Sequence, residues 1–232
     1  MLKYDIVAVT CLALEARIAQ GPGVSVLCNP SVKLSAMLEA AIARGATGII
    51  SFGIAGGLAR HLVAGDCVVA SAVRHGNDVI ATDRGWARSL LDAIPNAIHA
   101  DVAGADALVM NPAEKNRIHA QTGAAAVDME SHIAAKIARA HRIPFAACRI
   151  IIDAAHRALP PAAVVGLRKD GTPDIGAVLL SVLQKPGQIP DLVRTARDAC
   201  IAARALRAAR KRLGAGLGFP EYNEFAFELA VA

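Results

Sequence analysis

Short, strongly apolar runs alternate with helical patterns along the first two thirds of the chain, and this alternation most constrains the fold. Strand-like runs occupy residues 4–10, 47–53, 65–73 and 144–155. Helical spacing of apolar residues occurs at 32–44, 113–123 and 131–142. Strands that alternate with helices predict a layered α/β fold with a largely parallel sheet.

The sequence pattern changes at Leu159. From there on, prolines separate short helical segments and no strand pattern occurs. We therefore predict a single domain over residues 1–232, with an α/β core at 1–158 and a helical C-terminal extension at 159–232. The composition fits this fold: 54% of the residues are hydrophobic but only 3% are aromatic. A core built from Ala, Val, Ile and Leu favours buried parallel strands covered by helices.

The chain shows no sign of export or membrane insertion. No apolar run reaches the roughly 18 residues that a membrane span needs, and the apolar start "MLKYDIVAVT" is too short for a signal peptide and is interpreted as a first strand. The five cysteines are scattered and form no CxxC pair. This pattern favours reduced thiols in a cytoplasmic protein.

The formal charge of +5 is concentrated in one segment. Between Asp191 and Leu213, seven basic residues stand against two acidic ones, which accounts for the whole excess. The rest of the chain is neutral, which argues against a general nucleic-acid binder. An apolar stripe marks 191–213 as a helix, with its members at Leu192, Ala196, Ala199, Ala203 and Leu206. Its basic face predicts either an ordinary surface helix or contact with an anionic membrane surface.

A glycine-rich segment, "SFGIAGGLA" at 51–59, follows the second strand and is predicted to be a turn. Glycines allow the backbone to approach a ligand closely and expose N–H groups. The segment could equally be a tight strand-to-helix turn with no ligand. Ligand sites in open α/β sheets lie at the carboxyl ends of strands, which is where this segment falls.

Acidic residues follow three other predicted strands. Asp153 ends the apolar run "RIIID", Glu130 ends "AAAVDME", and Glu15 comes soon after the first strand. A carboxyl group in a low-dielectric site suits proton donation, and an ionised one can accept hydrogen bonds from a pair of hydroxyls. Each acid could alone be an ordinary helix cap or first-turn acid. In a parallel sheet, however, these strand ends converge on one rim.

The order of these motifs resembles the nucleoside phosphorylase and nucleosidase superfamily, in its methylthioadenosine/adenosylhomocysteine nucleosidase branch. The motifs are Glu15, then "GIAGGL" with "GDCVV", then "VDME", then "RIIID", over about residues 4–156. The resemblance implies a three-layer fold with a mixed, mostly parallel central sheet. It also implies cleavage of a purine–ribose bond, with no metal or organic cofactor.

The resemblance assigns roles to individual residues. Asp153 falls on the acid that protonates purine N7, and Glu15 on the acid that positions the attacking water in nucleosidases. Glu130 falls on the carboxylate that binds the ribose hydroxyls, and Met129 packs beneath the sugar. The remaining predicted pocket residues are Gly53, Ile54, Ala55, Gly56, Asp128 and Ile152.

Three positions depart from the family pattern. Ile152 replaces the usual Ser before the acid, Ile54 replaces a Ser or Thr, and Asp128 replaces a Glu. For phosphate as a co-substrate, the sequence offers Arg17 and the backbone N–H groups of the glycine segment. These residues leave phosphorolysis and hydrolysis both open.

Residues 157–207 look like the tail of the hopanoid-associated phosphorylases. That resemblance implies release of adenine from adenosylhopane, a purine nucleoside with a hydrophobic tail, in bacteriohopanepolyol biosynthesis. The wider superfamily resemblance implies a homo-oligomer, a dimer or larger. The cysteine pattern predicts a cytoplasmic protein, and the basic helix at 191–213 leaves open a peripheral location at the inner membrane surface. The alternatives are a methylthioadenosine/adenosylhomocysteine nucleosidase and, from another class, a nucleotide-binding module without catalysis.

The seven histidines show no metal-ligand spacing along the sequence, and most are expected at the surface or at an interface. Only His75 and His156 lie near the predicted rim.

Overall fold

The computed structural model describes residues 5–28, 33–165, 181 and 184–220. The strands are β1 (Ile6–Thr10), β2 (Val24–Cys28), β3 (Gly48–Gly57), β4 (Cys67–His75), β5 (Asp78–Ala81), β6 (Ile98–Gly104), β7 (Ala126–Asp128) and β8 (Phe145–Asp153). The helices are α1 (Ala13–Ala19), α2 (Leu34–Ala43), α3 (Arg84–Ala93), α4 (Pro112–Thr122), α5 (Ser131–His141), α6 (Pro161–Val165) and α8 (Ile189–Leu213). Short 3-10 turns occupy Pro186–Gln188 and Ala215–Gly218. Parts of the predicted C-terminal extension, 166–180, 182–183 and 221–232, lie outside the described residues.

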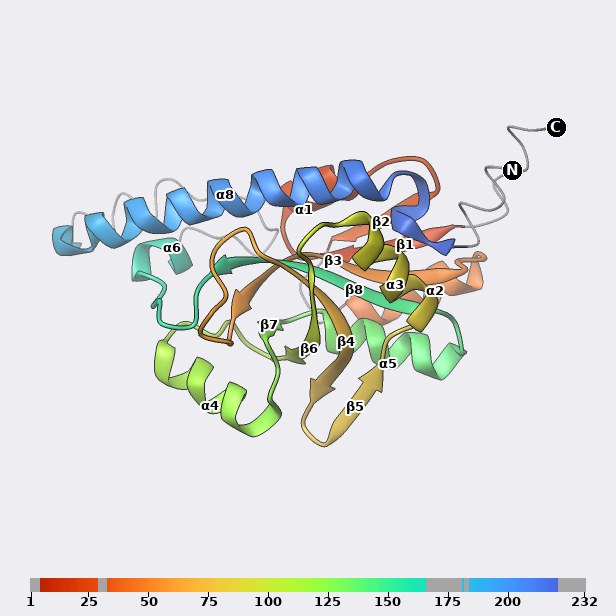
Figure 1. Cartoon of the computed structure of the whole chain (residues 1–232), viewed down its shortest axis with the longest axis horizontal. Helices are drawn as coiled ribbons and strands as arrows, with labels where there is room; N and C mark the ends of the chain where they lie inside the picture. The colour runs from red at the N-terminus through yellow and green to blue at the C-terminus, as the bar shows by residue number, and fades with distance from the viewer. Residues whose placement is uncertain (1–4, 29–32, 166–180, 182–183, 221–232) are drawn as a thin grey trace.

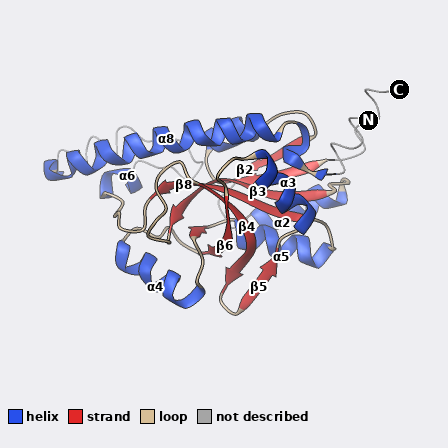
Figure 2. Cartoon of the chain, in the orientation of Figure 1, coloured by secondary structure: helices blue, strands red, loops and turns tan. Residues whose placement is uncertain are grey.

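The strands form one mixed sheet in the order β2-β1-β3-β7-β6-β4-β5, and β8 pairs with both β3 and β4 (Figure 2). The strands β3, β8, β4, β6 and β7 therefore close a ring of pairings. Five of the eight pairings are parallel and three are antiparallel. This confirms the predicted mixed, mostly parallel sheet.

Helices cover both faces of the sheet, as the alternation in β1 illustrates. Val7 and Val9 pack in the core on the side of α2 and α5. Ile6 and Ala8 point the other way, into a second core with residues of α1, α3 and α8. Because successive side chains of a strand face opposite sides, a strand buried on both faces is apolar throughout. The three-layer arrangement is thus confirmed (Figure 1).

The glycine-rich segment is not a turn, so that prediction was wrong. It is the second half of β3, which continues to Gly57. Gly56 pairs with Val127 of β7 on one side and with Asp153 of β8 on the other. A Cβ atom on Gly57 would lie 3.1 Å from the Asp153 carbonyl oxygen. The glycines therefore allow three strands to crowd together at this end of the sheet.

Several elements had not been predicted, among them β2, β6 and α3. The strand β2 lies at the edge of the sheet and none of its residues is fully buried. The strand β6 carries His99 and Asp101 among its apolar residues, which weakens its strand pattern. The helix α3 does carry a helical signal, since Trp86, Ala87 and Leu90 are buried at i, i+1 and i+4.

The predicted basic helix is confirmed as α8, but its contact face is shifted. The buried residues are Ala202, Leu206, Ala209 and Leu213. Of the predicted stripe, only Leu206 is fully buried and Ala196 is exposed. The N-terminal half of α8 buries no residue and runs on beside α6 (Figure 1). The buried face of α8 differs from the predicted stripe because only the C-terminal half of the helix packs against the sheet.

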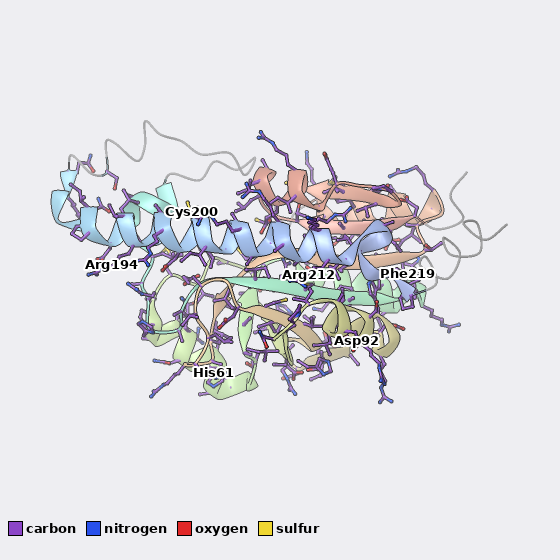
Figure 3. All side chains as sticks on the ribbon, turned by 45° about the horizontal axis from the view of Figure 1, so that its top comes forward. His61, Asp92, Arg194, Cys200, Arg212 and Phe219 are labelled. Carbon is purple, nitrogen blue, oxygen red and sulfur yellow. The ribbon has the colours of Figure 1, made fainter. Side chains whose placement is uncertain are left out.

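The charged face of α8 is open to solvent along its length. Arg194, Arg197, Arg204 and Lys211 are all exposed, and Figure 3 shows Arg194 and Arg212 at opposite ends of the helix. Membrane contact through this face stays a prediction. Within the part of the chain that the structure describes, no helix is long and apolar enough to cross a membrane.

The two halves of α8 should respond differently to the same kind of truncation. Leu206 is 1% exposed and Val193 is 63% exposed. We expect Leu206→Ala to lower the free energy of unfolding by about 2–5 kcal/mol, because it leaves a cavity in the core. The control, Val193→Ala, should change it by less than about 0.5 kcal/mol. Urea denaturation measures both, and equal effects would contradict the packing described.

Candidate functional site

The second half of β3 is the centre of the candidate site, because the elements that carry the predicted residues pair with it. Gly53 pairs with Arg149 of β8, and Gly56 lies between Asp153 and β7. A Cβ atom on Gly53 would lie 2.5 Å from Oε1 of Glu15 and 2.8 Å from Nη1 of Arg149. Glycine is therefore required at position 53 because charged groups occupy the space of a side chain.

Glu15 is buried at the start of α1 and joins two strand ends. Its Oε2 accepts hydrogen bonds from the backbone N–H groups of Cys11 and Leu12, at 2.8 and 2.7 Å. Its Oε1 accepts from the N–H of Ile54 at 2.7 Å. Burial raises the pKa of the Glu15 carboxyl, and the nearby Arg149 opposes this shift.

Arg149 is fully buried within β8 and holds the acidic groups together. Its Nε lies 2.5 Å from Oδ2 of Asp128, and its Nη2 lies 3.5 Å from Oε2 of Glu130. It also donates to the hydroxyls of Ser51 and Ser131. Removing one member of such a buried group leaves uncompensated charge, which is strongly destabilising.

Asp128, predicted as a pocket residue, stabilises the turn between β7 and α5. Its Oδ1 accepts a hydrogen bond from the backbone N–H of Ser131 at 3.0 Å, which satisfies a donor at the start of α5. Its Oδ2 faces Arg149. Asp128 therefore supports the turn from β7 into α5 and orients Arg149.

The carboxyl of Glu130 is held by Arg149 and by a hydrogen bond with the Cys11 thiol. Its Oε1 is buried and has no hydrogen-bond partner among the described residues. Burial raises the pKa of the Glu130 carboxyl to about 7, although Arg149 lowers it. A buried acceptor without a partner is uncommon, since buried polar groups are nearly always hydrogen-bonded. This oxygen is therefore a candidate for binding a donor from outside the chain.

Asp153 ends β8 and forms an ion pair with Lys115 of α4. Lys115 is fully buried, and its Nζ also donates to the carbonyl oxygens of Ala154 and Arg157, at 3.0 and 3.3 Å. All three donors of the ammonium group are thus used. Burial raises the pKa of the Asp153 carboxyl, whereas Lys115 lowers it. The pair holds a titratable carboxyl in a buried position at the strand end.

A cavity of about 280 Å³ lies beside Asp153. Its walls come from the end of β8 with the loop after it and from α8, through Ile152, Asp153, His156, Arg157, Ala158, Leu159, Asp191, Arg194, Thr195 and Asp198. A larger cavity, of about 420 Å³, lies at the opposite end of β8 near Phe145, and no residue predicted for the site lines it. We favour the cavity at Asp153, because ligands of α/β sheets bind at the carboxyl ends of strands.

The structure places the predicted site residues in two groups, and of them only Ile152 and Asp153 line the cavity beside Asp153. Glu15, Gly53, Asp128 and Glu130 surround Arg149, and Gly56 lies next to Asp153. The other predicted residues on these strand ends are half-buried Ile54, Met129 and Ile152 and buried Ala55. Arg17, proposed for phosphate, is exposed on α1. The N–H of Ile54 is already bonded to Glu15.

Two functional candidates had no role in the sequence-based prediction. Arg149 stands at the start of "RIIID", and a charged residue inside an apolar strand indicates a buried partner. Lys115 gave no such signal, because it belongs to the polar stretch "AEKNR" of a surface helix. The expectation that histidines are mostly superficial fails for His132, which is 5% exposed.

Comparison with known proteins supports the interpretation of the fold. The model of the phosphorylase superfamily matches residues 18–184, which is more than half of the chain. The chain therefore belongs to the phosphorylase superfamily. No curated protein matches it in sequence.

Solved structures show the same fold at low sequence identity. The 5′-methylthioadenosine/S-adenosylhomocysteine nucleosidase of Helicobacter pylori has a TM-score of 0.64 and 14% identity, over 92% of this chain and 97% of that one. The Campylobacter jejuni nucleosidase has a TM-score of 0.61 and 16% identity, over 90% and 99%. Futalosine hydrolase of Helicobacter pylori has a TM-score of 0.58 and 16% identity, over 64% and 87%.

The importance of Arg149 can be measured through stability. We expect Arg149→Met to lower the free energy of unfolding by about 3–5 kcal/mol, because Asp128 and Glu130 lose their buried counter-charge. The control is Arg74→Met, which removes a partly exposed ion pair with Asp101 and should cost about 1 kcal/mol or less. Chemical denaturation compares the two, and similar losses would contradict the central role of Arg149.

Proposed function

We propose that this protein cleaves the N-glycosidic bond of a purine nucleoside and releases adenine. The observation that carries the proposal is the pair of acids around β3: Glu130 with a free buried oxygen, and Asp153 held at a strand end by Lys115. Membership of the phosphorylase superfamily supports it. A mutant of the Helicobacter pylori nucleosidase with this fold has 5′-methylthioadenosine in its active site.

Glu130 is the proposed ribose ligand. In its ionised form, Oε1 accepts a hydrogen bond from a ribose hydroxyl while Oε2 remains on Arg149. Arg149 orients the carboxylate and offsets its charge, so the free oxygen is aimed before the substrate arrives. Half-buried Met129 is the proposed apolar surface beneath the sugar.

Asp153 is the proposed acid that protonates N7 of the purine. As the C1′–N9 bond breaks, its electron pair moves to the base, and the proton from the Asp153 carboxyl neutralises that charge. Burial favours the protonated carboxyl. Lys115 is the proposed positioning residue, since it fixes both Asp153 and the following loop.

We propose adenosylhopane as the substrate and inorganic phosphate as the acceptor of the ribosyl group. The apolar residues Ile54 and Ile152 replace family hydroxyls at the pocket, which suits a nucleoside with a hydrophobic tail. Leu159 adds an apolar side chain to the cavity next to Asp153. Arg17, exposed on α1, is the proposed phosphate ligand. The runner-up is hydrolysis of methylthioadenosine or adenosylhomocysteine, with Glu15 positioning the water.

Phosphate dependence separates the two reactions. We expect adenine release from adenosylhopane to require inorganic phosphate, with a pentose 1-phosphate as the second product. The same assay with methylthioadenosine and adenosylhomocysteine tests the runner-up substrates. Adenine release at the same rate without phosphate would refute the phosphorylase mechanism and leave the nucleosidase.

The acid role of Asp153 can be tested by an isosteric change. We expect Asp153→Asn to lower kcat by about 10²–10⁴-fold, the usual contribution of general acid catalysis. The control Asp92→Asn changes an exposed carboxylate of α3 that pairs with Arg88 and should leave turnover unchanged. Near-normal turnover by Asp153→Asn would remove the acid assignment. A wild type that binds the nucleosides but releases no adenine from any of them would instead favour a non-catalytic binding module.

The pH dependence of binding tests Glu130. Its carboxyl has a pKa of about 7, so the ionised acceptor form increases as the pH rises through that value. We expect the affinity for an uncleavable adenosine analogue to rise about tenfold between pH 6 and pH 8. Isothermal titration calorimetry measures it. Glu130→Gln should bind weakly with no such slope, and an unchanged slope in this variant would assign the titration elsewhere.

A further inference from the structure

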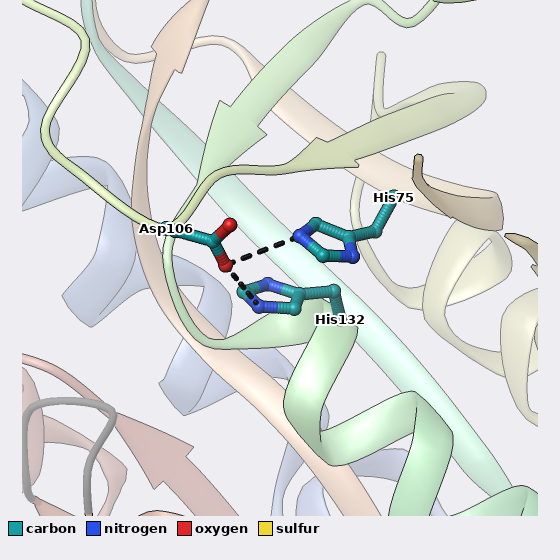
Figure 4. Close-up of side chains that lie close together, drawn as sticks. All are labelled: His75, Asp106 and His132. Atoms are coloured by element: carbon teal, nitrogen blue, oxygen red, sulfur yellow. Dashed lines mark hydrogen bonds and ion pairs between the residues drawn. The ribbon is translucent and has the colours of Figure 1, made fainter. Parts of the chain in front are cut away.

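Two histidines and one aspartate converge on one point near the carboxyl ends of β4 and β6 (Figure 4). His75 ends β4, Asp106 follows β6, and His132 lies in the first turn of α5. Oδ1 of Asp106 is 3.1 Å from Nε2 of His75 and 3.4 Å from Nε2 of His132. The three potential ligand atoms all lie within 4.8 Å of one another.

These separations fit a small divalent ion. Zinc bonds to histidine nitrogen and carboxylate oxygen are about 2.0–2.2 Å long, so tetrahedral ligand atoms lie about 3.3–3.6 Å apart. The two nitrogen–oxygen distances are already close to these values. Two imidazoles and one carboxylate are a common ligand set for zinc and for other first-row divalent metals.

The two imidazole rings are stacked, with centroids 4.2 Å apart and planes that differ by 13°. A shared ion requires the rings to turn, and χ2 of histidine is a broad torsion that permits such a rotation. Nζ of Lys136 donates to Nδ1 of His75 at 3.2 Å, so a neutral His75 carries its proton on Nε2 and donates it to Asp106. A metal at Nε2 displaces this proton, and Lys136 then keeps Asp78 as its partner at 3.5 Å.

The surroundings of the cluster also fit a metal. His132 is buried, and its Nδ1 has no hydrogen-bond partner among the described residues. No such bond therefore fixes its tautomer, and Nε2 is free to present a lone pair. The Asp106 side chain is 81% exposed, which leaves the remaining coordination position open to water.

We propose that His75, Asp106 and His132 form a binding site for a divalent transition metal of the zinc type, with solvent as the fourth ligand. The site is separate from Asp153 and is independent of the proposed reaction. It links the ends of β4 and β6 to the first turn of α5. His132 in that turn lies two residues after Glu130. The spacing of the histidines along the sequence did not reveal it, because the three ligands come from three elements.

Zinc binding by the untagged full-length chain tests the site. After treatment with a chelator and its removal, Zn²⁺ is titrated by calorimetry and checked by equilibrium dialysis. We expect one ion per chain. His75→Ala and Asp106→Asn should each weaken binding by at least about tenfold, since even outer partners of metal ligands contribute about 10–100-fold.

The matched control is His141→Ala, which removes another histidine–carboxylate pair, with Glu39 at 2.5 Å. It should bind Zn²⁺ as the wild type does. Circular dichroism verifies that each variant is folded. Absence of stoichiometric binding by the wild type, or equal affinity in the wild type, His75→Ala and Asp106→Asn, would overturn the proposal.

Discussion

The buried guanidinium of Arg149 is the constraint on which the candidate site depends. Three carboxylates, Glu15, Asp128 and Glu130, reach the same buried region from different parts of the chain, and this one cation faces them. Burial raises the pKa values of Glu15 and Glu130, and Arg149 opposes both shifts. For Glu130, the neighbouring carboxylates Asp128 and Glu15 add to the rise. Gly53 is required because this group fills the space beside it.

The two proposed functional acids are controlled in different ways. Glu130 is held by Arg149 through one oxygen, and its other oxygen is left for a ligand. Asp153 is held by Lys115, whose remaining donors tie down the loop that follows β8. The environment of Glu130 thus suits its carboxyl to accept hydrogen bonds, and the environment of Asp153 suits its carboxyl to donate a proton. The strand β3 lies between these two residues. Its glycines have no side chains, which leaves room for carboxyl groups on either side.

The fold class could be predicted because strands buried on both faces leave continuous apolar runs, as β1 and β8 do. The acids could be placed at one rim because parallel strands bring their carboxyl ends together. The buried cations that pair with the site acids could not be predicted, because they come from distant parts of the chain. Lys115 belongs to a polar helix, and Arg149 reveals its partners only when β7 and β8 are placed. The end of β3 was mistaken for a turn because its pairing with β7 is non-local.

The central claim is that adenine is cleaved from its ribose between Asp153 and Glu130. A crystal structure of the protein with adenine tests it most directly. We expect the purine beside Asp153, with N7 within about 2.6–3.2 Å of its carboxyl oxygen, and with Oε1 of Glu130 facing the place of the ribose. Adenine bound away from Asp153, for example in the cavity at the Phe145 end of β8, would contradict the proposed roles of both acids.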